Sequence, residues 1–375
     1  MSFSKSLKGF RILDFTRLIP GPFGTHLLVE MGADVIKIED MGKGDYLNGL
    51  PPEIVSGVSG LFAALNTGKK RLKLNFSSHD GRLIVKKLVK TAHAVVESFR
   101  PGAMDVWGIG YQALRKTNPK LVYASMTAFG SKGVDSQQAG HDINFLAASG
   151  FLDHFPGGVP SYQFGDFIGG GLWGALKILD ALHASKRERK GRFLDLNVTD
   201  ALVALRRHEL FAETAPDLRM ITGKLARYQV YHSHDGRAVA LGAFEDKFWD
   251  AFCVAIKQPA WRGLTLDDTV NRQQITALTK LFSSQCATYW HQFSIEHDIC
   301  LTVSATKDDL MASERLRAVS FKCGDEKTTV YESSALTKKS QLHLSRPGED
   351  TRSVLKQAGY TAAQIKKFYQ DEVVA

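Results

Sequence analysis

The sequence lacks long apolar runs and closely spaced cysteines, and these absences exclude several classes of protein. No apolar run reaches the roughly 18 residues that a membrane-spanning helix needs, so no membrane partner is expected. The opening MSFSKSLKGFRILDF leads from polar residues into a strand-like segment, without the apolar stretch of a signal peptide. The cysteines are scattered without C-x-x-C spacing, which indicates reduced, buried thiols. These features predict a cytoplasmic protein with no disulfide framework and no metal site.

The sequence also lacks the motifs of most nucleotide-dependent and hydrolytic enzymes. It has no P-loop, no G-x-S-x-G elbow and no H-E-x-x-H zinc motif. Gly21, Gly24 and Gly32 follow the first expected strand at the wrong spacing for G-x-G-x-x-G. Nicotinamide-dependent chemistry is therefore not expected.

The formal net charge of +9 raises the question of a nucleic-acid partner. Lysines and arginines are spread along the chain, with no basic helix and no basic-aromatic module, so no nucleic acid is expected. The short basic run at 186–190 is interrupted by Glu188 and reads as a solvated loop after a helix. A multiply phosphorylated small ligand would account for some of the basic residues, and a soluble surface for the rest.

Short β-rich runs alternate with helical patterns through the first 200 residues. Strands are predicted at 11–15, 34–38, 93–97, 121–125 and 193–198, with helices between them, one of which runs from 172 to 184. This alternation predicts an α/β fold with a doubly wound, mostly parallel, Rossmann-like sheet. The length of 375 residues favours two domains, a large one at 1–190 and a small α+β one at 200–330 that begins with a D-G hairpin.

Two loops contain residues suited to acid-base chemistry. Asp166 stands among glycines in GDFIGGG, where free backbone N–H groups of a following helix can hold a carboxylate and stabilise an oxyanion. An equally good interpretation is that Asp166 is a helix cap and that the glycines serve close packing of the helix on the sheet. His141 in GHDINF is singly more typical of a structural histidine, and the adjacent Asp142 is expected either to fix its tautomer or to cap the segment at Ile143. Glu245 in GAFE is a weaker candidate, for which the alternative is that it only begins the helix of Lys247, Phe248 and Phe252.

Seven ordered segments resemble the CaiB/BaiF, or class III coenzyme A-transferase, family, and within it the α-methylacyl-CoA racemases. The segments are LKGFRILDFTRLIPGPFGTHLLVEMGADVIKIE, LNTGKKRLKLNF, VVESFRPGAMDVWGIGY, AGHDINFLAASG, GDFIGGG, GKLARYQVYHSHDGRAVALGAFEDKFW and GEDTRSVLKQAGY. Departures from the family pattern are Val106 in place of a second basic residue, a short stretch at 151–164 and a poor match at 300–331.

The resemblance implies roles for individual residues. Asp166 matches the carboxylate that is a covalent nucleophile in the transferases and a proton-transferring base in the racemases, and His141 matches the racemase marker. Glu245 matches a further active-site acid, with Tyr228 near it. Gly169 and Gly170 are expected near the substrate oxyanion. A coenzyme A face is implied, formed by Ile19, Lys37, Ala64, Lys70 and Arg100.

The resemblance further implies an interlocked homodimer, a large domain completed by residues 335–375, and no cofactor beyond the coenzyme A of the substrate. The preferred hypothesis is racemisation of a 2-methylacyl-CoA, with His141 and Asp166 on opposite faces of a planar enolate. Glu245 would orient His141 or a bound water. The rivals are CoA transfer between carboxylic acids through Asp166 and an inactive CoA-binding member of the family.

Overall fold

A computed structural model describes residues 3–155, 157–212, 223–336 and 339–375. The chain forms two compact units, one of Met1–Arg206 with Arg315–Ala375 and one of Arg207–Glu314. The chain therefore leaves the large unit once and returns to it. Residues 315–330, which the sequence assigned to the small domain, lie in the large unit because strands β12 (Leu316–Cys323) and β13 (Glu326–Ser333) share a sheet with β14 (Gln341–Leu344).

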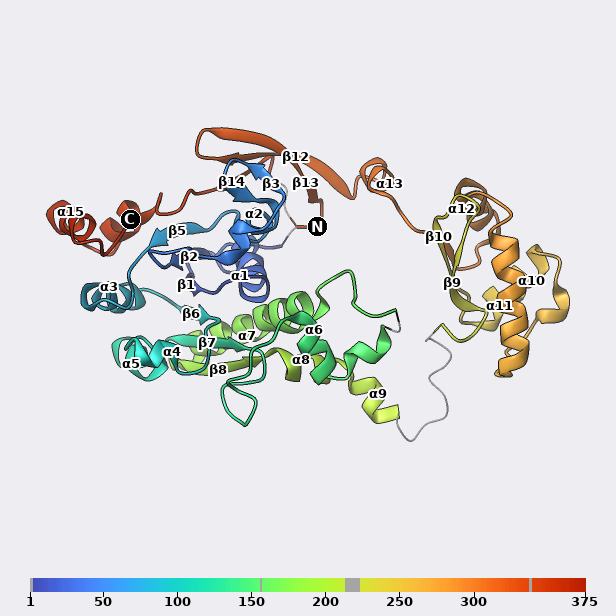
Figure 1. The fold of residues 1–375 in the computed structure, drawn as a ribbon, viewed down its shortest axis with the longest axis horizontal. Coiled ribbons are helices and arrows are strands. Elements are labelled where there is room, and N and C mark those ends of the chain that lie inside the picture. The colour runs from blue at the N-terminus through green and yellow to red at the C-terminus, as the bar shows by residue number, and fades with distance from the viewer. Residues whose placement is uncertain (1–2, 156, 213–222, 337–338) are drawn as a thin grey trace. The chain divides into compact units, whose positions relative to one another are not determined.

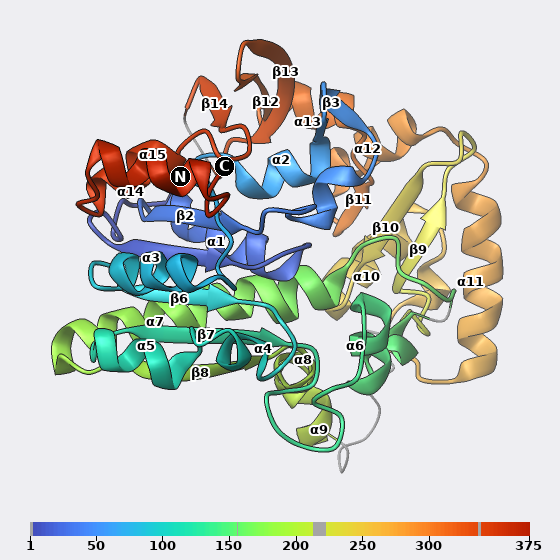
Figure 2. The same ribbon diagram turned by 60° about the vertical axis from the view of Figure 1, so that its left-hand side comes forward.

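The large unit is built on a six-stranded sheet whose strand pairs are all parallel, which confirms the predicted α/β class (Figure 2). Numbered along the chain within this sheet, the strands run 3-2-1-4-5-6, the order of the dinucleotide-binding Rossmann fold. The strands are β5 (Lys70–Lys73), β2 (Asp34–Glu39), β1 (Arg11–Phe15), β6 (Ala94–Glu97), β7 (Val122–Thr127) and β8 (Arg192–Asn197). The order reverses between β1 and β6, where open α/β sheets bind ligands at the carboxyl ends of the strands.

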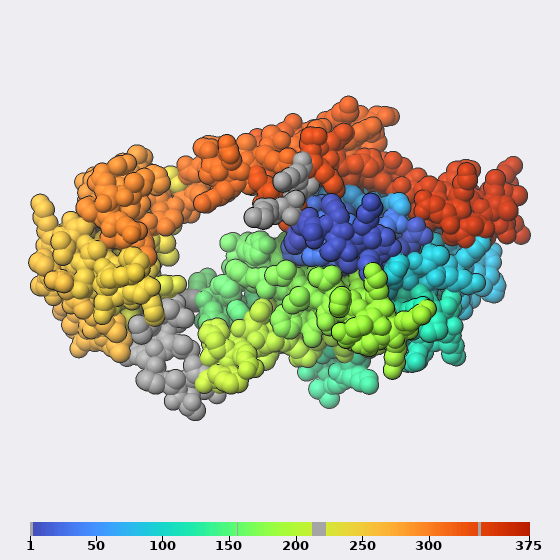
Figure 3. All heavy atoms as spheres, turned by 180° about the vertical axis from the view of Figure 1, so that it is seen from behind, coloured from blue at the N-terminus to red at the C-terminus, as the bar shows by residue number. Residues whose placement is uncertain are grey.

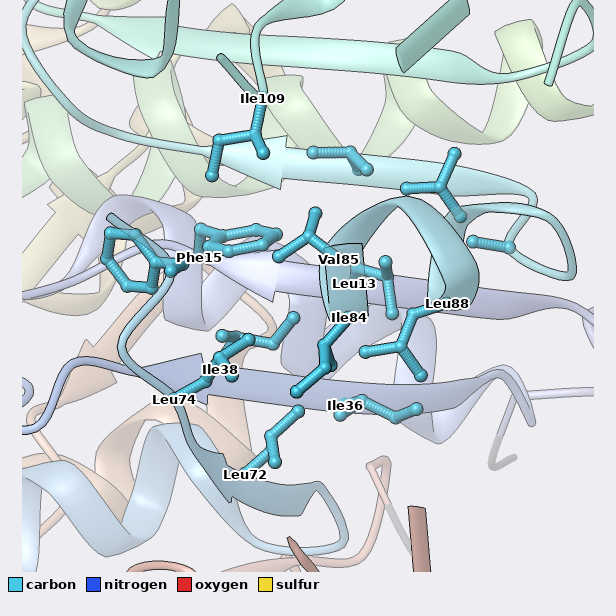
Figure 4. Packing of buried hydrophobic residues seen from close by; sticks show 14 of the residues in the cluster. Leu13, Phe15, Ile36, Ile38, Leu72, Leu74, Ile84, Val85, Leu88 and Ile109 are labelled. Carbon is cyan, nitrogen blue, oxygen red and sulfur yellow. The ribbon is translucent and has the colours of Figure 1, made fainter. Parts of the chain in front are cut away.

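Helices cover both faces of this sheet because its strands bury side chains on both sides. On one face Leu13, Ile36 and Leu72 pack against Ile84 and Leu88 of α3 (His79–Val89), as Figure 4 shows. The same core takes in α5 (Tyr111–Thr117), α14 (Thr351–Gln357) and α15 (Ala362–Gln370), so the C-terminal segment completes the large unit. The opposite face is covered by α1 (Pro20–Glu30), α7 (Trp173–Glu188) and α8 (Val198–Leu205).

A third core joins the returning strands to the N-terminal half (Figure 1). It packs β12 and β14 against β4 (Val58–Ser59) and α2 (Gly60–Asn66), with β3 (Glu53–Val55) paired to β4. Short helices α4 (Ala103–Val106), α6 (Asp142–Ala148) and α9 (Arg207–Ala212) lie in the connections. Val106 is 83% exposed on α4, so its apolar side chain adds nothing to the core.

A buried ion pair ties β1 to the segment before β5. The Asp14 carboxylate lies 3.0 Å from the Lys69 ammonium, and both side chains are fully buried. Lys69 also donates to Thr25 Oγ1 at 2.8 Å and to Asn66 Oδ1 at 2.9 Å. Burial lowers the pKa of Lys69 to about 8 against the opposing attraction of Asp14. This cluster holds α1 and α2 in place beside the carboxyl end of β1.

The small unit has a three-stranded sheet in the order β11-β10-β9, formed by Leu301–Val303, Ala238–Gly242 and Tyr228–His232. The predicted hairpin is confirmed, because β9 and β10 pair antiparallel around Asp235 and Gly236. Tyr231, Trp249, Phe252, Phe282 and Trp290 form most of its aromatic core. Its helices are α10 (Asp246–Ala255), α11 (Asp268–Phe282), α12 (Ala287–His297) and α13 (Lys307–Ala312).

Candidate active site

A cleft of about 630 Å³ lies at the carboxyl edge of the parallel sheet. It is lined by the segments that follow β1, β6 and β7 and by the loop that leads into α6; Arg17, Leu18, Ser98, Arg100, Thr127, His141 and Asp166 are among its residues. The sheet order reverses between β1 and β6, so this cleft occupies the position where the topology predicts a ligand. His141 and Asp166, the two residues predicted to transfer protons, both line this cleft.

His141 lines the cleft from the start of α6. Its backbone is extended, with φ −122° and ψ 177°, and it is the residue that precedes the first turn of the helix. The His141 N–H donates to Asn144 Oδ1 at 3.0 Å. The local sequence His-Asp-Ile-Asn thus fixes the backbone, while the imidazole is exposed on the cleft wall. A backbone cap and an available imidazole therefore coexist at this residue.

Asp166 lies in the first turn of a π-helical segment, Gly165–Leu172, that continues directly into α7. The α-helix predicted to begin near Leu172 is α7, which begins at Trp173, but the sequence did not predict the π-helical segment before it. Asp166 therefore lies inside helical structure and is not the cap that the alternative interpretation proposed. Burial, and to a smaller extent the charge of Asp142, raises the pKa of Asp166 to about 7. A carboxyl group with a pKa near neutrality is able both to take up and to release a proton at working pH.

Asp142 has a role that neither sequence interpretation included. Its Oδ1 accepts a hydrogen bond from the Asp166 N–H at 2.8 Å, and the Gly165 N–H also donates to its side chain. Asp142 therefore caps the π-helix across a chain separation of 24 residues. The cap fixes the backbone of Asp166 and places a second carboxylate beside it. A pattern of i to i+3 spacing cannot reveal such a cap, because the two residues are distant in sequence.

The glycines of GDFIGGG serve close packing. A Cβ on Gly170 would lie 2.5 Å from Pro20 Cβ of α1, and one on Gly169 would lie 3.0 Å from Leu202 Cγ of α8. Real Cβ contacts of 2.5 Å do not occur, so a side chain at Gly170 would displace α1. The alternative interpretation expected close packing of a helix on the sheet, but the nearest contacts of both glycines are to helices α1 and α8. Their part in oxyanion binding stays a prediction.

Two arginines of the cleft are suited to bind phosphates. Arg100 is exposed and its Nη1 donates to the Gln137 carbonyl at 3.0 Å. Arg17, which sequence reasoning missed, pairs with Asp40 and lies 5.1 Å from the ring centroid of Phe99. The feature that could have identified Arg17 is its position two residues after β1, because a sheet with the Rossmann strand order binds ligands at the carboxyl ends of its strands.

Lys37 and Lys70, predicted to contact coenzyme A, lie elsewhere. The Lys37 ammonium is fully buried, 2.9 Å from both Asp45 Oδ2 and the Thr16 carbonyl. Asp45 in turn accepts from the N–H of Leu18, a cleft residue held at φ 64°. Lys37 therefore supports the strained loop after β1 from inside the protein. Lys70 pairs with Asp34 at 2.6 Å near the amino end of the sheet, on the edge opposite to the cleft.

The remaining predicted residues are spread over both units. Ile19 packs half-buried on the core beneath α2, and Ala64 is exposed on that helix. Glu245 immediately precedes α10, and Tyr228 pairs with Gly242 across β9 and β10. Both belong to the small unit, so their participation in catalysis stays a prediction.

Within the described ranges, no group of three or more His, Cys, Asp or Glu side chains is placed to hold a metal ion. None of the helices seen there has the length and apolar character to cross a membrane.

Comparisons with known proteins agree with this architecture. Human α-methylacyl-CoA racemase is 26% identical over 399 aligned positions that cover 98% of this chain and 97% of the racemase. Acetyl-CoA:oxalate CoA-transferase from Acetobacter aceti is 32% identical over 75% of this chain and 76% of its own length. Succinyl-CoA:mesaconate CoA-transferase from Haloarcula marismortui is 32% identical over 68% of each chain.

Solved structures show the same fold. A Mycobacterium tuberculosis protein in an orthorhombic crystal form is 26% identical, with a TM-score of 0.76 over 94% of this chain and 100% of its own. A CaiB/BaiF family protein from Brucella suis is 23% identical and also superposes with a TM-score of 0.76, over 94% of this chain and 99% of its own. The sequence profile of CoA-transferase family III matches residues 7–339. The chain therefore belongs to CoA-transferase family III, as the seven sequence segments predicted.

Proposed function

We propose that the cleft binds an acyl-CoA thioester and that His141 and Asp166 exchange the proton on the carbon next to the thioester carbonyl. Racemisation or epimerisation of a 2-methylacyl-CoA is the reaction. One observation carries the proposal: both side chains line the same cleft, and the pKa of Asp166 is raised to about 7. The similarity to a racemase over 98% of the chain is consistent with it.

The reaction requires one base and one acid that change roles with direction. For one epimer the imidazole of His141 removes the α-proton, and the electron pair of the C–H bond moves into the thioester as an enolate. The protonated carboxyl of Asp166 then donates its proton to the opposite face, which inverts the carbon. In the reverse direction Asp166 is the base and His141 the acid. The scheme requires no group beyond the coenzyme A of the substrate.

The surroundings of Asp166 favour an apolar acyl group. Phe167 follows it in the π-helix and stacks on Tyr162, with ring centroids 4.9 Å apart, while Phe164 precedes it and stacks on Phe155 at 5.4 Å. Within the cleft itself, we expect the branched end of the acyl chain to lie against the apolar lining residues Met126, Phe145 and Val198.

We expect the phosphates of the coenzyme A nucleotide to bind at Arg100 and Arg17. A guanidinium offers two parallel donors to a phosphate and remains charged at all working pH values. Glu245 and Tyr228 of the small unit are proposed to complete the site in an interlocked homodimer. Sedimentation showing a stable monomer would contradict that part of the proposal.

CoA transfer between carboxylic acids is the second candidate, favoured by the 32% identity to two CoA-transferases. In that reaction the Asp166 carboxylate attacks the thioester carbonyl, the thiolate of CoA leaves, and an acyl anhydride forms. The reaction needs an ionised carboxylate and an acceptor acid. A pKa of about 7 leaves much of Asp166 protonated at neutral pH, and a protonated carboxyl is a poor nucleophile.

Incubation with a 2-methylacyl-CoA in heavy water separates the two reactions. Proton transfer places deuterium at the α-carbon without any acceptor acid. His141→Ala and Asp166→Asn should each abolish inversion of the α-carbon, and each should abolish deuterium incorporation into the epimer on which the replaced residue is the base. Arg115→Ala, on the exposed surface of α5, is the matched control and should retain it. If CoA exchange instead requires an acceptor acid and hydroxylamine traps Asp166, the protein is a transferase. CoA binding without either reaction would identify an inactive member of the family.

A further inference from the structure

A second cleft, of about 620 Å³, lies at the amino-terminal edge of the parallel sheet. It is lined by residues just before β1, β6 and β7, together with the last turn of α7. In Figure 3 the dark-blue N-terminal segment lies beside the green part of the chain on this face of the large unit. The carboxyl ends of the same strands form the candidate active site, so the two clefts occupy opposite edges of one sheet.

The lining of this second cleft carries positive charge only. Its cations are Lys8, Lys90, Lys120, Lys186 and Arg189, and the lining includes no Asp or Glu. A concave surface with charges of one sign concentrates the electric field and attracts an ion of the opposite sign. The volume falls within the range of small-molecule sites, roughly 300–1,000 Å³.

Neighbouring acids do not neutralise this charge. Asp34 already pairs with Arg11 at 2.9 Å and with Lys70 at 2.6 Å. Glu188 pairs with Arg187 at 3.0 Å and with Arg192 at 2.5 Å. Among the described residues, both acids are therefore committed to cations outside the lining of the cleft.

Helix electrostatics explain only part of the cluster. Lys90, Lys186 and Arg189 lie at the C-terminal ends of α3 and α7, where a cation offsets the negative end of the helix dipole. Lys8 precedes β1, and Lys120 precedes β7 two residues beyond Asn118, the C-cap of α5, so neither lysine lies in the last turn of a helix. Helix electrostatics explain these two lysines least, so we expect an anionic ligand to contact them.

An aromatic platform lies among the cations. The rings of Phe10 and His93 have centroids 4.8 Å apart, and the Lys186 ammonium lies 5.7 Å from the Phe10 centroid. His93 Nδ1 accepts a hydrogen bond from the Arg11 N–H at 3.0 Å, so the proton of the neutral ring is on Nε2. Buried Ala92 and Leu182 add an apolar floor. Stacking surfaces beside cations are the features that proteins use to hold a base together with its phosphates.

We propose that this amino-edge cleft binds a nucleoside diphosphate or a related nucleotide. The base packs on Phe10 and His93, and the phosphates contact Lys8 and Lys120. The site is separate from the acyl-CoA cleft, so its ligand and CoA bind together.

Calorimetry with ADP on the full chain tests the proposal, in the presence of enough CoA to fill the carboxyl-edge cleft. We expect ADP to bind, and the double variant Lys8→Ala/Lys120→Ala to weaken its affinity about ten-fold or more. The matched control is Lys280→Ala/Lys366→Ala, which removes the same charge from exposed positions of α11 and α15 and should leave the affinity unchanged. Phe10→Leu should weaken binding of ADP while leaving binding of inorganic pyrophosphate the same.

Three results would overturn the proposal. CoA displacing ADP would place the nucleotide in the acyl-CoA cleft. An equal loss of affinity in both double variants would mean attraction by net charge alone. Pyrophosphate binding as tightly as ADP, with no effect of Phe10→Leu on either, would rule out a base on the aromatic platform. The thermal unfolding curve of each variant should match that of the unmodified protein, which shows that a loss of ADP binding is not caused by a loss of folding.

Discussion

Replacing Asp142 by Asn should lower the pH at which Asp166 becomes active as a base. Asp142 accepts hydrogen bonds from the N–H groups of Asp166 and Gly165, and its charge helps to raise the pKa of Asp166. The Asn side-chain oxygen still accepts such bonds, so the backbone of the π-helix should stay in place. The substitution therefore removes the charge and keeps the cap.

The size of the effect follows from the causes of the raised pKa. The pKa of Asp166 rises from an ordinary value of 3.8 to about 7. This rise corresponds to ~4 kcal/mol in favour of the protonated carboxyl. Burial is the larger of the two causes, so removing the charge of Asp142 should lower the pKa by less than about 1.5, or ~2 kcal/mol.

The assay is the pH dependence of kcat/KM for deuterium incorporation into the epimer on which Asp166 is the base. Activity requires ionised Asp166, so the rate rises with pH through its pKa, and the ascending limb of Asp142→Asn should lie at lower pH. Asp371→Asn, at an exposed C-terminal position, removes the same charge and should leave the limb unmoved. A limb that stays in place in Asp142→Asn, or moves to higher pH, would refute the electrostatic coupling of the two carboxyls.

Three further predictions concern stability. Asp166→Asn should raise the free energy of unfolding by up to ~4 kcal/mol at about pH 9, because ionising a carboxyl with a raised folded-state pKa destabilises the native state; the gain should vanish below about pH 3.8 in urea titrations. Lys69→Met should lower the free energy of unfolding by about 3–5 kcal/mol, since Asp14 would be left as an unpaired buried charge. The double variant Lys69→Met/Asp14→Asn should regain most of that loss. Gly170→Ala should lower the thermal midpoint at a cost of about 1–3 kcal/mol by overpacking, whereas Gly49→Ala, whose Cβ would meet nothing within 4 Å, should leave it unchanged.

Much of the large unit could be predicted from the sequence because its strands are buried runs with a strong local signal. The strand predicted at 11–15 is β1, and the hairpin after residue 228 is β9 and β10. Sequence motifs also identified the residues of the cleft that carry distinctive chemistry, His141 and Asp166. Arg17 was missed, because a lone arginine after a strand has no pattern until the sheet order is known.

The predicted coenzyme A contacts of Lys37 and Lys70 were the weakest predictions. A motif identifies the segment to which a residue belongs, but it gives no information on the direction of the side chain. Lys37 alternates with apolar residues in β2 and points inward to Asp45, and Lys70 begins its strand at the edge away from the cleft. A single-sequence pattern gives no information on such partners, since Lys37 and Asp45 meet only when the loop after β2 folds back.

The amino-acid sequence by itself determined the family, the alternation of strands and helices, and the two groups suited to proton transfer. Each of these depends on residues that are close together in the sequence. Only the tertiary structure decided the sheet order, which brings the ends of β1 and β6 together to form the cleft. It also decided the ionisation of Asp166, since a carboxyl group acquires a raised pKa from the groups packed around it, and here Asp142 comes from 24 residues away.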